Sequence, residues 1–225
     1  MTHLLDNIVW HTLSAAHHHL SVGAADARRY SPGFSPIIGF ADVENPNFAA
    51  LEVHCEPGEQ LYTDGWAGPA PAGWNIDAES TMFKMVWDAP VPAEDEAPDA
   101  VPLGPAHASQ AVDLARMTNP GPFGLRTLEL GDYFGYFEEG RLIAMAGERF
   151  HAAPWREVSG VCTHSDYRGR GLARRLMMRL IHRQVRRGET PFLHVMRDNA
   201  TARDLYRRMD FVEYRETVVR VVSRL

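Results

Sequence analysis

Hydrophobic and polar residues are patterned along this chain in a way that predicts helices and strands in alternation. Near the N-terminus the spacing of apolar residues predicts a helix from about Asp6 to Leu20. Short runs rich in β-branched and aromatic residues then predict strands at about 36–41, 60–63 and 81–87. The first 88 residues therefore predict an α/β unit, and they contain no catalytic motif.

The segment 89–105 differs from both of its neighbours, because prolines alternate there with acidic residues. This composition is typical of a linker. We therefore expect an N-terminal unit over 1–88, a linker over 89–105 and a second unit over 106–225.

The second unit again shows helix and strand patterns. Apolar residues recur at helical spacing from Leu172 to Val185, and Gly188 is placed to end that helix. Two further helices are predicted at 108–117 and 199–208. The predicted strands are 133–137, 141–150, 157–163 and 191–196, followed by a closing hairpin of 211–214 and 218–222.

Composition and charge exclude several classes of protein. No apolar run reaches the roughly 18 to 20 residues that cross a bilayer, and no targeting segment is visible, so we expect a cytoplasmic protein without membrane contact. A formal net charge of −6 disfavours a nucleic-acid partner. His17, His18 and His19 are adjacent on a predicted helix, where they point in different directions, so we expect no metal site.

The sequence Arg168-Gly169-Arg170-Gly171-Leu172-Ala173 joins a predicted strand to a predicted helix. Glycines let a main chain approach a ligand closely, and free amides at a helix start bind anions. A Walker A loop would need Gly-Lys-Ser/Thr, which is missing, and a dinucleotide fingerprint would need a small residue where Arg174 stands. The segment is therefore suited to a pyrophosphate of another kind.

This segment resembles the Q/R-x-x-G-x-G/A signature of the GNAT N-acetyltransferase superfamily, in which Arg168, Gly171 and Ala173 occupy the defined positions. A second family pattern, N-x-x-A-x-x-L-Y-x-x-x-G-F, is matched downstream by Asn199, Ala202, Leu205, Tyr206 and Phe211. Only Asp210 departs from it. A positive φ is common there, and Asp tolerates it better than most residues.

The resemblance covers about Ala106 to Leu225, and over Glu157–Ala173 it is similar to the branch that includes glycine N-acyltransferases. It implies an α/β (α+β) fold with a mixed, mostly antiparallel central sheet flanked by helices. The first half is then interpreted as a degenerate second copy of this fold. The implied function is transfer of an acyl group, normally acetyl, from acyl-CoA directly to an amine, without a metal.

The resemblance also implies where the cosubstrate would bind. Strand 157–163 is expected to part from strand 191–196 and to leave a gap for the pantetheine arm. The implied contacts are Val161, Cys162, Thr163, Arg168, Gly169, Arg170, Gly171, Leu172, Ala173, Arg174 and Asn199. Each arginine could equally be a solvated helix residue, and Asn199 could equally cap its helix.

Three residues are candidates for proton transfer. Tyr206 matches the family tyrosine that donates a proton to the leaving sulfur, although such a tyrosine can also be a core residue. Glu157, expected on the same strand face as Ser159 and Val161, is the candidate base, and Glu148 is its rival. A structural salt bridge is the alternative for either carboxylate.

Other interpretations remain open at the level of sequence. Cys162 could suggest an acyl-cysteine intermediate, but a buried structural residue is favoured. A chain that binds acyl-CoA without catalysis would be a sensor or an interaction module. The basic helix face of Arg174, Arg175, Arg179, Arg183, Arg186 and Arg187 could touch RNA, but a solvated helix face is favoured. The acceptor, a small-molecule amine or a peptide, is not specified, and homodimer formation is left open.

Overall fold

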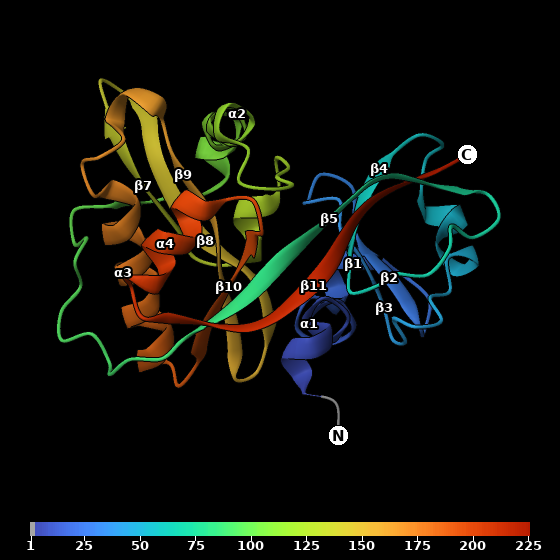
Figure 1. Cartoon of the computed structure of the whole chain (residues 1–225). Helices are drawn as coiled ribbons and strands as arrows, with labels where there is room; N and C mark the ends of the chain where they lie inside the picture. The colour runs from blue at the N-terminus through green and yellow to red at the C-terminus, as the bar shows by residue number, and fades with distance from the viewer. Residues whose placement is uncertain (1–2) are drawn as a thin grey trace.

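The computed structural model describes residues 3–225 and contains an eight-stranded sheet, a three-stranded sheet and flanking helices (Figure 1). The order in the large sheet is β4-β11-β5-β10-β9-β8-β7-β6, and every neighbouring pair is antiparallel except β9 and β10. The small sheet has the order β1-β2-β3. A mixed, mostly antiparallel sheet flanked by helices is thus confirmed.

The strands of the large sheet are β4 (Gln60–Asp64), β5 (Trp74–Trp87), β6 (Val101–Pro102), β7 (Tyr133–Glu138), β8 (Arg141–Ala152), β9 (Trp155–Thr163), β10 (Thr190–Met196) and β11 (Phe211–Arg224). Those of the small sheet are β1 (Ser21–Gly23), β2 (Ala27–Tyr30) and β3 (Ile38–Phe40). The helices are α1 (Ile8–His11), α2 (Ala108–Thr118), α3 (Leu172–Arg186) and α4 (Ala200–Arg207). Shorter 3-10 and π turns extend the helical segment around α1 over residues 4–20, with a break at His17.

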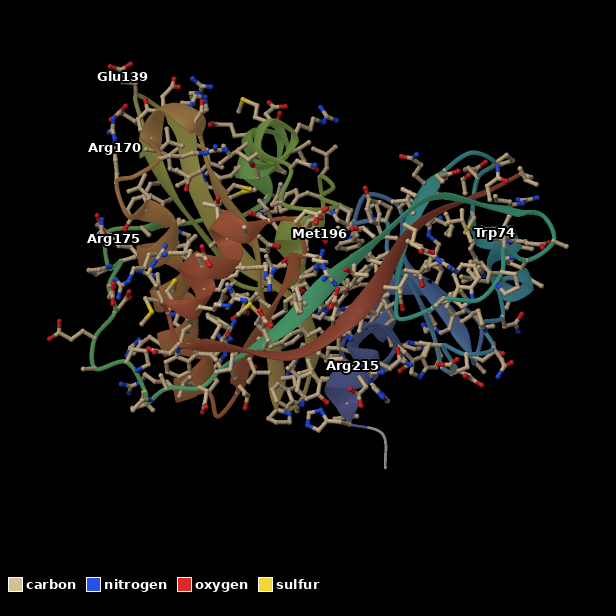
Figure 2. The ribbon with its side chains drawn as sticks, in the orientation of Figure 1. Trp74, Glu139, Arg170, Arg175, Met196 and Arg215 are labelled. Carbon is tan, nitrogen blue, oxygen red and sulfur yellow. The ribbon has the colours of Figure 1, made fainter. Side chains whose placement is uncertain are left out.

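The two longest strands, β5 and β11, run side by side across the whole molecule (Figure 1). Trp74 begins β5 at one end of the molecule, and Glu139 marks the other end (Figure 2). The prediction of a closing hairpin over 211–222 was wrong, because β11 is one continuous strand. No glycine or proline interrupts the segment 213–217. Its polar residues continue the strand that pairs with β5, and the register shifts once there, between Glu213 and Arg215.

Alternation along β10 divides the core between the two faces of the sheet. Leu193 and Val195 pack with α3 residues such as Leu176 and Leu180 in one buried cluster. Phe192, one position away, packs with residues of the N-terminal helical segment in another. Because successive strand residues point to opposite faces, α3 covers one face and α1 covers the other.

The segment 89–105 runs along α3 and is attached to it by ion pairs. Arg174 pairs with Glu96, Arg175 with Asp99 at 2.7 Å, and Arg179 with Asp95 at 3.2 Å. The arginine stripe of α3 is thus occupied by acids and is not simply solvated, as the sequence suggested. This pairing removes most of the free positive charge that RNA binding would use.

Strands from both halves of the chain form the large sheet, since β5 hydrogen-bonds to β10 on one side and to β11 on the other. The division at 89–105 and the origin of the first half as a second copy of the fold stay predictions. Within residues 3–225, no helix combines the length and the apolar character that a membrane crossing requires. His17 turns inward to hydrogen-bond Tyr30 at 2.8 Å, whereas His18 and His19 are exposed.

A buried ion pair fixes the N-terminal segment to the sheet. The Lys84 ammonium is 2.8 Å from the Asp64 carboxylate and also donates to the carbonyls of Leu5 and Asp6. Both charged side chains are nearly inaccessible, at 0% and 7% exposure. Breaking a buried pair from one side leaves an uncompensated charge, which costs far more than breaking an exposed pair.

Lys84→Met should therefore lower the free energy of unfolding by about 3 to 5 kcal/mol in urea denaturation. Arg116→Met, which breaks the exposed pair with Asp113, is the control and should change it by less than about 0.5 kcal/mol. Adding Asp64→Leu to Lys84→Met should recover part of the loss. Equal stability of Lys84→Met and the control would show that the pair does not hold this segment.

Candidate active site

The parallel strands β9 and β10 pair over only three positions and then part. Thr190, Pro191 and Phe192 face Trp155, Arg156 and Glu157, and no pair follows toward the C-terminal end of either strand. A cavity of about 950 Å³ opens at this point. It is lined by β9, by β10, by the loop that precedes α3, and by α4. Parts of β4, β5 and β11 also line it.

A bulge in β9 changes which side chains face this cavity. The register with β8 shifts so that Gly160 and Val161 stand opposite a single residue, and Gly160 has a φ of 61°. Val161 consequently packs with the α3 cluster, while Cys162 packs with α2 residues. The expectation that Val161 shares a face with Glu157 was wrong, because it assumed unbroken alternation.

The glycine loop before α3 presents bare main chain to open space. Gly169 and Gly171 have φ values of 76° and 74°, and a β-carbon built on either would have no neighbour within 4 Å. No side chain caps α3 at Gly171, and among residues 3–225 no main-chain carbonyl accepts from the amides of 169–174. Six unpaired donors at the positive end of a helix dipole can bind a pyrophosphate.

The arginines of this loop differ in their freedom to contact a ligand. Arg168 lines the cavity and makes no ion pair within the described chain. Arg170 lies 3.8 Å from Glu138 and stacks over the ring of Tyr167. Because Arg174 is already paired with Glu96, its guanidinium is the least available of the three.

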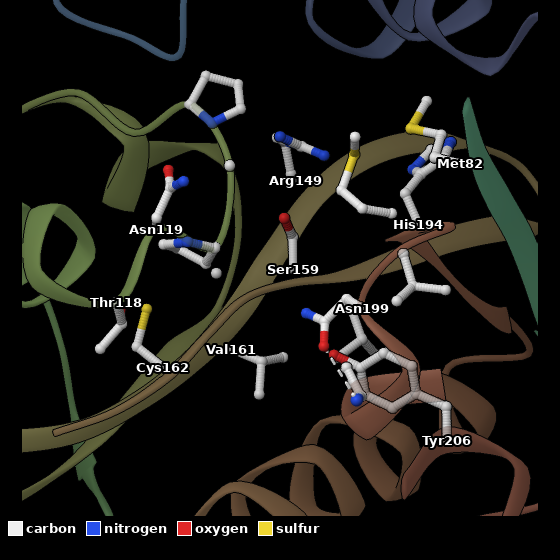
Figure 3. Close-up of a pocket in the computed structure, with 18 of the residues that line it drawn as sticks. Met82, Thr118, Asn119, Arg149, Ser159, Val161, Cys162, His194, Asn199 and Tyr206 are labelled. Atoms are coloured by element: carbon white, nitrogen blue, oxygen red, sulfur yellow. Dashed lines mark hydrogen bonds between the residues drawn. The ribbon is translucent and has the colours of Figure 1, made fainter. Parts of the chain in front are cut away.

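Residues farther along the cavity fit an arm that leads away from the loop. Thr163 has a buried hydroxyl without a hydrogen-bond partner among the described residues, which is costly unless a ligand satisfies it. Asn199 caps α4 by accepting from the amide of Ala202 at 3.1 Å, and it borders the cavity as well (Figure 3). The capping role of Asn199 therefore does not exclude a ligand contact.

Tyr206 enters the cavity from α4 (Figure 3). Its ring packs edge-on against Phe211, with 6.1 Å between centroids, and within residues 3–225 no hydrogen bond engages its hydroxyl. Burial raises the pKa of the Tyr206 hydroxyl to about 12. The hydroxyl therefore stays protonated near neutral pH and has a proton to donate.

Glu157 lies at the last paired position of β9 and β10, and both of its carboxylate oxygens are in hydrogen bonds. Its two oxygens accept from the Arg149 guanidinium at 2.9 Å each, from the Phe150 amide at 3.2 Å and face Nδ1 of His194 at 2.7 Å. Burial alone would raise the pKa of Glu157, but the charge of Arg149 and the hydrogen bonds from His194 and Arg149 outweigh it and lower the pKa well below its usual range. A carboxylate this acidic is a very weak base.

The structure does not bring Glu148 to the cavity. Its carboxylate is buried on the α3 face, where it accepts from Gln184 at 3.0 Å and from Arg187 at 2.5 Å. Glu148 and Glu157 thus lie on opposite faces of the sheet. The alternative of a structural salt bridge describes Glu148 fully.

Sequence reasoning missed Arg149, Ser159 and His194, all of which border the cavity (Figure 3). No motif marks them, since they come from three different strands and have no fixed spacing along the chain. A second bulge places Arg149 and Phe150 opposite Glu157, which is why Arg149 faces this carboxylate. Unexplained polar residues on buried strands were the only indication available.

Comparisons with known proteins agree with this geometry. The family model described as FR47-like protein matches residues 133–221. A crystal structure of an acetyltransferase assigned to the GNAT family from Novosphingobium aromaticivorans is 33% identical, with a TM-score of 0.90 over 100% of both chains. No curated protein matches the chain.

More distant solved structures share the fold. A GCN5-related N-acetyltransferase-like protein from Streptococcus suis is 14% identical and has a TM-score of 0.61, covering 97% of this chain and 92% of the other. A GCN5-related N-acetyltransferase from Kribbella flavida is 15% identical with a TM-score of 0.58 over the same shares. At this identity they show a common fold alone.

Neither cysteine should react with thiol reagents in the folded protein. Both are buried, and burial raises the pKa of the Cys162 thiol to about 12 and that of Cys55 above its usual range. Ellman's reagent at pH 8 should therefore titrate no thiol in the native state and both in guanidinium chloride. Rapid native labelling of Cys162, tested with Cys55→Ala, would contradict this placement and revive a cysteine nucleophile.

Proposed function

The chain belongs to the GNAT family of acetyltransferases, and we propose that it transfers an acetyl group from acetyl-CoA directly to the amine of a small molecule or a peptide. The observation that carries this proposal is the glycine loop, whose unpaired amides at the start of α3 border the cavity between β9 and β10. The amides of 169–174 would hold the pyrophosphate, and Arg168 would add a charge-assisted contact.

The remainder of the cosubstrate would follow the gap between the parted strands. The main chain of Val161 and Thr163 borders this gap, and the unpartnered Thr163 hydroxyl would gain a hydrogen bond there. When bound, acetyl-CoA would supply an activated acyl group as its thioester. A cavity of about 950 Å³ also leaves space for an acceptor on the side of β4, β5 and β11.

The chemistry needs a proton acceptor and a proton donor. An alkyl ammonium with a pKa near 10 is only about one part in a thousand neutral at pH 7, which costs about 4 kcal/mol. After attack, the departing sulfur is best stabilised by an acid. Tyr206 is the proposed acid, since its hydroxyl is protonated, has no hydrogen-bond partner among residues 3–225 and borders the cavity.

Direct transfer is favoured over an acyl-enzyme. Of the two cysteines, both within the described residues, Cys162 alone borders the cavity, and burial keeps its thiol protonated by raising its pKa to about 12. It also packs within the apolar cluster around α2. The proposed acceptor is a small-molecule amine or a peptide.

Gly171→Val tests the phosphate loop. The new side chain would fill the space that the bare main chain leaves open and would strain a φ of 74°, so acetyl-CoA binding should weaken by at least about 100-fold in calorimetry. Gly140→Val is the matched control, because Gly140 has a φ of 76° and equally open surroundings but lies in the turn between β7 and β8. Equal affinity of both variants would contradict the loop assignment.

Tyr206→Phe tests the acid. Removing the hydroxyl should lower kcat by about 100-fold while the dissociation constant of acetyl-CoA changes little, because the proton is needed only as the C–S bond breaks. Thiol release measures turnover, and circular dichroism controls for folding. An unchanged kcat would remove Tyr206 from the mechanism, and tight binding without turnover on any amine would favour the sensor.

A further inference from the structure

Resting on the acetyl transfer proposed above, we propose that Nε2 of His194 takes the proton from the acceptor amine. In this proposal Glu157 is a positioning residue that acts through His194 and does not contact the amine. The two residues lie on the strands that part to form the cavity, one on β10 and one on β9. Neither belongs to the motif that identifies the cosubstrate loop.

The contacts of Glu157 decide which nitrogen of His194 carries the proton. Arg149 holds one side of this carboxylate with two hydrogen bonds of 2.9 Å, and Nδ1 of His194 lies 2.7 Å from Oε1. An ionised carboxylate only accepts hydrogen bonds, so Nδ1 must donate. In a neutral imidazole with a proton on Nδ1, the lone pair is on Nε2.

Nε2 is also the unsatisfied atom of this cluster. It is buried and has no hydrogen-bond partner among residues 3–225, and the side chain as a whole is 6% exposed. His194 nevertheless borders the cavity, together with Ser159 and Tyr206 (Figure 3). A buried nitrogen without a partner is costly unless the site holds a donor for it, and an amine would provide one.

Aromatic packing fixes the orientation of the ring. The imidazole packs edge-on against Phe150, with 6.0 Å between centroids, and against Phe192, with 5.6 Å between centroids. Together with the hydrogen bond to Glu157, these contacts hold the ring from three directions. A base held in this way needs little rearrangement when it accepts a proton.

Charged groups around His194 come from four other strands and form pairs. On β8, Arg149 neutralises Glu157 of β9. On β5, Lys84 stands opposite His194 in the register and neutralises Asp64 of β4. Because each cation has its own carboxylate, the imidazole borders two compensated ion pairs.

The proton balance of the reaction is complete with these groups. Nε2 of His194 takes one proton from the ammonium, the neutral nitrogen bonds to the thioester carbon, and the C–S bond breaks as the sulfur takes a proton from Tyr206 and the nitrogen loses its second proton to water. The products are an amide and a free thiol. His194 then releases its proton to water, and Tyr206 recovers one from it, so no further reactant is needed.

The tautomer can be measured in the protein without any ligand. Two-bond ¹⁵N correlation spectra of histidine-labelled protein should show a neutral His194 with a proton on Nδ1 and a bare Nε2, the resonance being assigned by its loss in His194→Asn. In Glu157→Gln this tautomer should no longer predominate. A proton on Nε2 in the neutral ring of the wild-type protein would overturn the proposal without reference to activity.

The kinetic test uses His194→Asn, because the Asn amide can still donate to Glu157 but has no basic nitrogen. With phenylethylamine as acceptor, kcat should fall by about 100-fold, the acid limb of the pH profile of kcat should disappear, and acetyl-CoA affinity should persist. Glycinamide is a weaker base than phenylethylamine, so the fall in kcat of His194→Asn should be smaller with glycinamide as acceptor.

Glu157→Gln should shift the acid limb of the pH profile of kcat, which a merely structural residue would not do. His182→Asn, on α3 outside the cavity, is the matched control.

The outcomes separate this inference from the function on which it rests. Absence of turnover by the wild-type protein with phenylethylamine, glycinamide and spermidine would overturn the acetyl transfer and this inference together. Wild-type turnover with an unchanged pH profile in His194→Asn would overturn this inference alone. Loss of the acid limb in His194→Asn but not in His182→Asn would support it.

Discussion

The parallel pairing of β9 and β10 ends after three residue pairs, and the features proposed for catalysis lie where these strands part. Strands that separate inside a protein leave main-chain groups without their usual partners, and such groups are costly unless something else satisfies them. Here the parted strands border a cavity that a ligand can enter. Glu157, which contacts Arg149 and His194, stands at the last paired position of the two strands.

Two different electrostatic arrangements meet in the cavity. At the loop before α3, main-chain amides and Arg168, which have no partners among residues 3–225, form a positive region made largely of bare main chain. Near β5 and β9 the charges are side chains that are buried and already paired. The first arrangement suits a polyanion and the second suits a group that must change its protonation state, so the two ends are fitted for different tasks.

Much of the fold could be predicted from the sequence because it is written in local patterns. The helical spacing from Leu172 and the glycine at 188 gave α3 nearly to its ends, and Asp210 has the positive φ expected of it, at 63°. The failures have a common cause. The closing hairpin, and the face on which Val161 lies, both depend on strand partners and bulges that only the assembled sheet determines.

The candidate site divides in the same way. The loop at 168–173 and Tyr206 could be found because a motif fixes their spacing. His194 and Arg149 come from different strands, and only the register of β8, β9 and β10 brings them to Glu157. Glu157 is a candidate from the sequence, but its acidity follows from Arg149 and His194, which no pattern in the sequence connects to it.

The placement of β5 between β10 and β11 also bears on how the molecule unfolds. Separating the two halves would break main-chain hydrogen bonds along both edges of β5, so the chain is expected to melt as one cooperative unit. A ligand bound at the loop 169–174 would then slow the hydrogen exchange of amides as far away as Trp74, at the start of β5. At a concentration one hundred times its dissociation constant, the gain is about 2.7 kcal/mol for the whole chain. Slower hydrogen exchange at residues far from this loop would therefore show that the loop is occupied, and would not show that the ligand contacts those residues.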